Sequence, residues 1–168
     1  MRLEDLNSLS LAEATNEMLK CCGSTNWATR MSERRPFSTH EELQQEAKRI
    51  WWSLGPVDWL EAFRSHPKIG EKKAQQHVSA EAQKWSEQEQ SSAAAATQDT
   101  MQALAKLNQD YEQRFGYIYI VCATGKSSEE MLAILQRRVD NAPEDELRLA
   151  AGEQAKITEL RLQKLLSL

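Results

Sequence analysis

Two short segments carry the side chains with the greatest capacity for chemistry. In the first, His66 precedes Pro67 in a run that ends at Gly70. Proline disfavours the α conformation of the residue before it, so a helix should end near Ser65 and hold the imidazole at a fixed angle. An imidazole with an ordinary pKa of about 6.5 can accept or donate a proton at neutral pH. The same residues also suit a simple helix-terminating turn, and their spacing leaves both interpretations open.

The second segment runs from Ser86 to Gln90. Ser86 and Glu89 have the S-x-x-E spacing of a capping box, which predicts that the longest helix of the chain begins near Glu89 and Gln90. The free N–H groups and the dipole of a helix start attract anions. Glu89 and Gln90 could therefore hold a polar ligand and orient a histidine, although an ordinary helix start has the same spacing.

The rest of the sequence offers few further candidates for catalytic residues or motifs. His40 and His77 lie among polar residues and are predicted to be solvated surface side chains. The sequence has no GxSxG, GxGxxG, Walker or HExxH motif. If the chain is an enzyme, we therefore expect it to use neither a metal nor an organic cofactor.

Helix signals dominate the rest of the chain and predict an all-α protein. Predicted helix starts lie at Ser10, Thr39, Ser86, Ser127 and Pro143. The exception is the run 117–123, which is rich in β-branched and aromatic residues. A lone strand has no partner, so near 117–124 we expect a buried, extended, non-helical segment whose backbone groups are available to a ligand. The predicted architecture is a single-domain helical bundle over residues 1–168.

The composition and charge of the chain argue against some classes of partner. The 168 residues include 21 Lys and Arg against 25 Asp and Glu, a formal net charge of −4, which argues against nucleic acid. No apolar run approaches the ~20 residues that span a membrane, and the first residues lack the apolar core of a secretory signal. Three cysteines without a CxxC spacing indicate buried thiols in a reducing compartment. We therefore expect a cytoplasmic protein with no nucleic-acid or membrane partner.

Four motifs together resemble the 2-oxo-4-hydroxy-4-carboxy-5-ureidoimidazoline (OHCU) decarboxylase family. They are Ser65-His66-Pro67-Lys68-Ile69-Gly70, Ser86-x-x-Glu89-Gln90, Leu107-Asn108-x-x-Tyr111 with Arg114-Phe115-Gly116, and Lys156-Ile157-x-x-Leu160-Arg161-Leu162. They occur in order along nearly the whole chain. The resemblance implies an all-α, cofactor-free lyase that decarboxylates a small molecule, OHCU, to (S)-allantoin in urate degradation. It also suggests a homodimer.

The resemblance further implies a set of site residues. His66 would be the essential histidine and Glu89 its acidic partner, which orients the ring and raises its affinity for a proton. Either the 4-hydroxyl or the carbanion formed on decarboxylation could exchange a proton with His66. The implied substrate-binding residues are Pro67, Ser86, Gln90, Val121, Cys122, Ala123, Thr124, Gly125 and Arg161, the last as an anion-binding guanidinium.

Three alternatives stay open at this point. Arg138, at a predicted helix end, is a rival to Arg161 for the anion, or a simple solvated helix-end cation. A different cofactor-free lyase or hydrolase could use the same His and Glu pair. The chain could instead be a non-catalytic helical interaction module whose tryptophans form a partner-binding face. These tryptophans are Trp27, Trp51, Trp52, Trp59 and Trp85.

Overall fold

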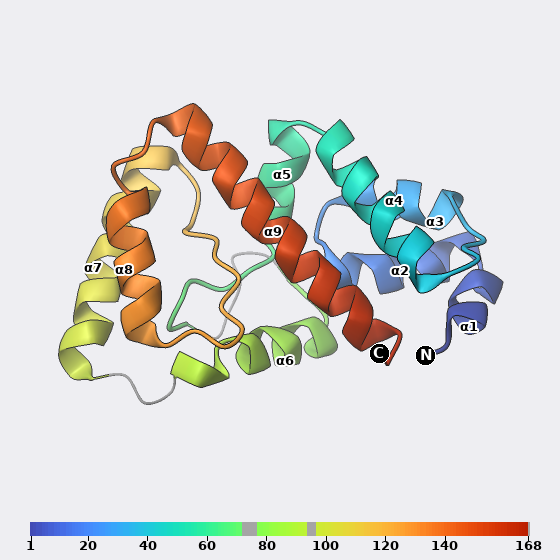
Figure 1. The fold of residues 1–168 in the computed structure, drawn as a ribbon, viewed down its shortest axis with the longest axis horizontal. Helices are drawn as coiled ribbons and strands as arrows, with labels where there is room; N and C mark the ends of the chain where they lie inside the picture. The colour runs from blue at the N-terminus through green and yellow to red at the C-terminus, as the bar shows by residue number, and fades with distance from the viewer. Residues whose placement is uncertain (72–76, 94–96, 168) are drawn as a thin grey trace. The chain divides into compact units, whose positions relative to one another are not determined.

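A computed structural model describes residues 1–71, 77–93 and 97–167 of the chain. These residues form helices joined by turns and irregular segments and contain no β-strand, which confirms the all-α prediction. In chain order the elements are α1 (Leu3–Ser8), α2 (Leu11–Cys21), α3 (Thr25–Glu33), α4 (His40–Ser53), α5 (Pro56–Phe63), α6 (Ala80–Glu89), the short 3-10 helix η1 (Ser91–Ala93), α7 (Gln98–Phe115), α8 (Ser128–Arg138) and α9 (Pro143–Leu165), as drawn in Figure 1.

Side-chain caps explain where most of these helices begin. At α2, Ser10 and Glu13 form the predicted capping box, in which each side chain accepts a hydrogen bond from the other's backbone N–H. Thr39 and Ser127 cap α4 and α8 as predicted, and Pro143 is the first residue of α9. The six-residue α1 was not predicted, because no Ser or Thr marks its start.

The residue contacts group into two compact units. The first unit comprises residues 1–62 with 155–168, and the second comprises residues 63–154. Helix α9 contributes its N-terminal half to the second unit and its C-terminal half to the first. A single domain over residues 1–168 stays a prediction.

In the first unit, α2 packs against α3 and α3 against α4. Trp27, Trp51 and Trp59 are buried there, whereas Trp52 is 44% exposed. Trp85 is buried in the second unit. Four of the five tryptophans therefore belong to the hydrophobic cores, which removes the main support for an aromatic partner-binding face.

In the second unit, α7 packs against α8, and the segment 116–127 links them. Figure 1 shows this link leaving the end of α7 and running back to the start of α8. Residues 118–123 of the link are all buried, so the predicted buried, non-helical segment is confirmed. The link and the two helices share one apolar cluster of Leu104, Tyr111, Tyr119, Val121, Ala123, Met131 and Leu135.

Within the described parts of the chain, no helix combines the length and apolar character needed to cross a bilayer.

Candidate active site

His66 lies in a tight turn directly after α5. Its backbone N–H donates to the carbonyl of Phe63 at 3.2 Å, and Pro67 follows, so the helix ends where the sequence predicted. The ring is largely buried, with 6% of the residue exposed. This turn therefore places a titratable imidazole inside the second unit instead of at its surface.

The ring of His66 is hydrogen-bonded to α9. Its Nε2 atom lies 2.7 Å from Oε1 of Gln154, a residue that is fully buried. Gln154 lies between the buried Ala150 and Ile157 of α9, and it is not among the site residues predicted from the sequence. The available signal was its polar side chain on an otherwise apolar stripe, because a buried amide needs a partner.

The predicted helix start at Ser86 is wrong. Ser86 and Glu89 lie in the last turn of α6, and Gln90 is the C-terminal cap of that helix. The N-terminal cap is instead Ser79, whose hydroxyl accepts a hydrogen bond from the N–H of Ala82. The Ser86 hydroxyl donates to the carbonyl of Ala82, one turn earlier in the same helix. The S-x-x-E spacing therefore occurs inside a helix, where it caps nothing.

This correction changes the electrostatics of the candidate site. Glu89 is buried at the C-terminal end of α6, where the helix dipole is negative and no free N–H groups are presented. The helix that follows, α7, starts later, capped by Thr97, and α9 is the longest helix among the described residues. An anion can therefore not be held by a helix start at Glu89, and a cation or a hydrogen-bond donor suits this position better.

Gln90 connects the end of α6 to the turn that contains His66. Its Oε1 accepts a hydrogen bond from the backbone N–H of Gly70 at 3.0 Å. Gly70 has a φ of +89°, a conformation that favours glycine. The segments that carry His66 and Glu89 are thus tied together by a side-chain-to-backbone bond.

A cavity of about 350 Å³ lies at the same turn. Its described lining is Pro67, Ile69, Gly70, Glu71, Glu87, Gln90, Ser91, Ala93, Met101 and Ser128. Of the predicted site residues, Pro67 and Gln90 line this cavity. His66, Glu89, Ser86 and the segment 121–125 are not part of its described lining.

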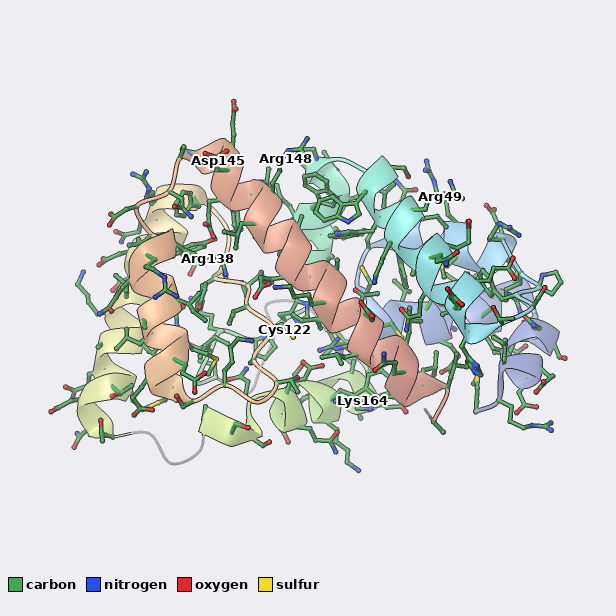
Figure 2. All side chains as sticks on the ribbon, in the orientation of Figure 1. Arg49, Cys122, Arg138, Asp145, Arg148 and Lys164 are labelled. Atoms are coloured by element: carbon green, nitrogen blue, oxygen red, sulfur yellow. The ribbon has the colours of Figure 1, made fainter. Side chains whose placement is uncertain are left out.

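The backbone of the predicted segment is hydrogen-bonded to side chains that are not among the predicted site residues. The N–H of Cys122 donates to Oε1 of Glu153 at 3.3 Å, and the Cys122 carbonyl accepts from Nζ of Lys126 at 2.6 Å. Val121, Cys122 and Ala123 are buried, whereas Thr124 and Gly125 are exposed. Cys122 is labelled on this link in Figure 2.

Burial and nearby charges shift the pKa of the Cys122 thiol on this segment. Burial raises the pKa of the Cys122 thiol, and the charge of Lys126 opposes that rise. The carboxylates of Glu153 and Glu89 raise it further. The link is hydrogen-bonded to Glu153 of α9 and His66 to the neighbouring Gln154, while the pairing of Glu89 with His66 stays a prediction.

The two candidate anion ligands have different surroundings. Arg138 is buried in the second unit, where its guanidinium forms an ion pair with Glu146 and donates to the carbonyl of Ile120. The interpretation of Arg138 as a solvated helix-end cation is therefore wrong. Arg161 is buried in the first unit and donates to the carbonyl of Lys20 at 3.2 Å. Substrate binding by Arg161 stays a prediction.

Among residues 1–71, 77–93 and 97–167, no group of three or more His, Cys, Asp or Glu side chains is arranged to hold a metal ion. All three cysteines are buried free thiols, as the sequence predicted.

Comparison with known proteins gives consistent matches. The family model described as OHCU decarboxylase matches residues 7–163. The uric acid degradation bifunctional protein TTL of Arabidopsis thaliana is 42% identical over 154 residues, which are 90% of this chain and 47% of that protein. The chain thus spans about half the length of this plant relative.

Two further matches cover most of the matched protein. The 2-oxo-4-hydroxy-4-carboxy-5-ureidoimidazoline decarboxylase of Mus musculus is 34% identical over 134 residues, which are 79% of this chain and 74% of the mouse protein. A crystal structure of OHCU decarboxylase in the presence of (S)-allantoin is 41% identical with a TM-score of 0.79, and the match covers 91% of this chain and 99% of that one.

Proposed function

Because this chain belongs to the OHCU decarboxylase family, we propose that it decarboxylates 2-oxo-4-hydroxy-4-carboxy-5-ureidoimidazoline to (S)-allantoin in urate degradation. The observation that carries the proposal is the family match over residues 7–163, which includes both His66 and Glu89. The buried imidazole of His66 supports it, because an enclosed acid or base is what a stereospecific protonation needs.

The reaction can proceed without a cofactor. The bond between the ring carbon and the carboxylate breaks, CO2 leaves, and the electron pair is delocalised into the adjacent C=N group of the imidazoline. The nitrogen of that group takes up a proton, the 4-hydroxyl then releases its proton and becomes the carbonyl of allantoin, and the adjacent ring carbon gains one proton on a single face. The protein has to hold the substrate, stabilise the developing negative charge and supply that proton.

Each residue of the candidate site has a distinct task in this proposal. His66 exchanges the proton, and Glu89 is its acidic partner, favouring the protonated ring. Pro67 and Gln90 contact substrate in the cavity that they line. The link supplies backbone contacts from Val121, Cys122, Ala123, Thr124 and Gly125. Ser86 and Arg161 supply further polar contacts, Arg161 as an anion-binding guanidinium.

A single substitution tests the role of His66. Substrate is generated from urate by urate oxidase and hydroxyisourate hydrolase, and the decay of its transient ultraviolet absorbance and the optical rotation of the allantoin are followed. His66→Gln should lower the rate by roughly 10²–10⁴-fold with an unchanged circular dichroism spectrum. His77→Gln is the matched control, because His77 is exposed. Unaltered formation of (S)-allantoin by His66→Gln would remove the assignment.

A second substitution tests Glu89. Glu89→Gln keeps the size of the side chain and removes its charge, so we expect most of the rate to disappear while helix content is retained. If helix content and activity fall in parallel, Glu89 is a structural residue and not the partner of His66.

A homodimer in the cytoplasm completes the proposal. Two large apolar side chains of the first unit, Trp52 and Val57, are 44% and 82% exposed, which supports self-association. The three free thiols support a reducing compartment. Light scattering that gives a mass near 19.2 kDa would contradict the dimer.

A further inference from the structure

The contact between His66 and Gln154 indicates which nitrogen of the imidazole ring carries the proton. The Nε2 atom of His66 and the amide Oε1 of Gln154 are 2.7 Å apart. An amide oxygen only accepts hydrogen bonds, so this contact is a hydrogen bond in the tautomer that carries the ring proton on Nε2. A neutral imidazole has one ring proton, and the contact therefore favours the Nε2–H tautomer.

Building on the proposed function, we infer that Gln154 is a positioning residue that keeps the ring proton of His66 on Nε2 and makes Nδ1 the nitrogen that titrates. Nε2 stays protonated in both charge states of the ring. The proton exchanged in the reaction therefore enters and leaves at Nδ1, and the Gln154 amide sets the ring orientation in which this occurs.

Burial explains why Gln154 can perform this task. The residue is fully buried, so its amide has no solvent to turn toward. It follows Ala150 and precedes Ile157 on an inward stripe where an apolar side chain would pack without needing a partner. A buried amide at this position is stabilised by the bond to His66, which an apolar residue could not make.

The neighbouring residue of α9 extends the same argument to the link. Glu153 accepts a hydrogen bond from the N–H of Cys122, while Gln154 holds the ring of His66. One turn of a regular helix therefore fixes both the proton-exchanging ring and the buried backbone segment. A rigid helix gives such a pair a more constant geometry than a loop would.

The tautomer can be measured directly, without substrate. Long-range proton–nitrogen correlation spectra of the uniformly nitrogen-labelled wild type are recorded at a pH where the His66 ring is neutral. The His66 signals are assigned by their loss in the spectrum of His66→Gln. We expect Nε2 to be protonated and Nδ1 to be unprotonated. A proton on Nδ1 would mean that the amide NH2 faces the ring, and this would overturn the inference.

Two substitutions of Gln154 provide the kinetic test. Gln154→Leu removes the acceptor, so kcat should fall by about 10- to 100-fold with a smaller change in KM. Gln154→Glu restores an acceptor and adds a negative charge, which favours the protonated ring. It should recover activity relative to Gln154→Leu and move the His66-dependent limb of the pH–rate profile to higher pH. An unaltered kcat in Gln154→Leu and an unaltered profile in Gln154→Glu would each contradict the inference.

A matched control separates this role from the general cost of losing a glutamine. Gln44 also bonds to α9, through its Nε2 and the carbonyl of Glu159 at 3.1 Å, but it lies in the first unit. Gln44→Leu should leave the pH profile and the His66 tautomer unchanged, and urea unfolding of all variants accounts for stability. If the wild type produces no (S)-allantoin, the proposed function fails, whereas the tautomer measurement still decides the role of Gln154.

Discussion

The buried ion pair between Arg138 and Glu146 should be a main determinant of stability in the second unit. The guanidinium Nε and Nη2 atoms lie 2.7 and 2.6 Å from Oε1 of Glu146, and Nη1 donates to the carbonyl of Ile120 at 2.6 Å. The hydroxyl of Tyr111 donates to the same carboxylate oxygen at 2.6 Å. Arg138 and Glu146 are 4% and 0% exposed. Figure 2 labels Arg138 at the end of α8.

Arg138→Met should therefore reduce the free energy of unfolding by about 3–5 kcal/mol, the usual cost of leaving one buried charge without its partner. The carboxylate of Glu146 keeps the bond from Tyr111 but loses its counter-charge, and the Ile120 carbonyl loses its donor. Domains of this size have roughly 5–15 kcal/mol of stability, so the variant should still fold at low temperature. Urea unfolding followed by far-ultraviolet circular dichroism measures the change.

Two further variants show whether the ion pair is the cause. Arg138→Met combined with Glu146→Leu removes both charges and should recover most of the lost stability, because apolar replacement of a whole buried pair is often neutral. Arg138→Lys retains the charge but cannot place two nitrogens on the carboxylate. It should therefore lower the free energy of unfolding by less than Arg138→Met does. A loss below about 1 kcal/mol in Arg138→Met would refute the reasoning. A raised KM with unchanged stability would instead indicate that Arg138 binds the substrate anion.

Further predictions concern the helix start, the thiols and the turn at the cavity. Ser79→Ala should destabilise the protein by about 1 kcal/mol because it removes the cap of α6, whereas Ser86→Ala should cost less in thermal unfolding; the opposite order would restore the helix start predicted from the sequence. Burial raises the pKa of the Cys22 thiol from 9.0 to about 12, so the neutral thiol is favoured in the folded state. Its contribution to stability is complete below pH 9.0 and is lost as the pH rises toward 12, and Cys22→Ala should make the urea midpoint less sensitive to alkaline pH. Gln90→Ala removes the acceptor of the Gly70 N–H and enlarges the cavity, so KM should rise more than kcat falls in steady-state kinetics; an unchanged KM would exclude Gln90 from substrate binding.

Local sequence signals determined much of the helical framework. The Ser10 and Glu13 pair, the Ser127 cap and the first-turn Pro143 each act within one helical turn, so their effect does not depend on distant residues. The proline after His66 fixed the end of α5 in the same way. The buried link between α7 and α8 was also predictable, because its apolar residues lack the polar positions of an exposed loop.

Only the tertiary structure decided which side chains meet. The S-x-x-E spacing of Ser86 and Glu89 is the same at a helix start and inside a helix, and the choice depended on Ser79 as the competing cap. Arg138 resembled a solvated helix-end cation until its ion pair with a carboxylate on another helix was known. Gln154 meets His66 across 88 positions of sequence, and no local pattern encodes such a contact. The sequence thus determined the segments, while packing between distant segments determined the partner of the central imidazole.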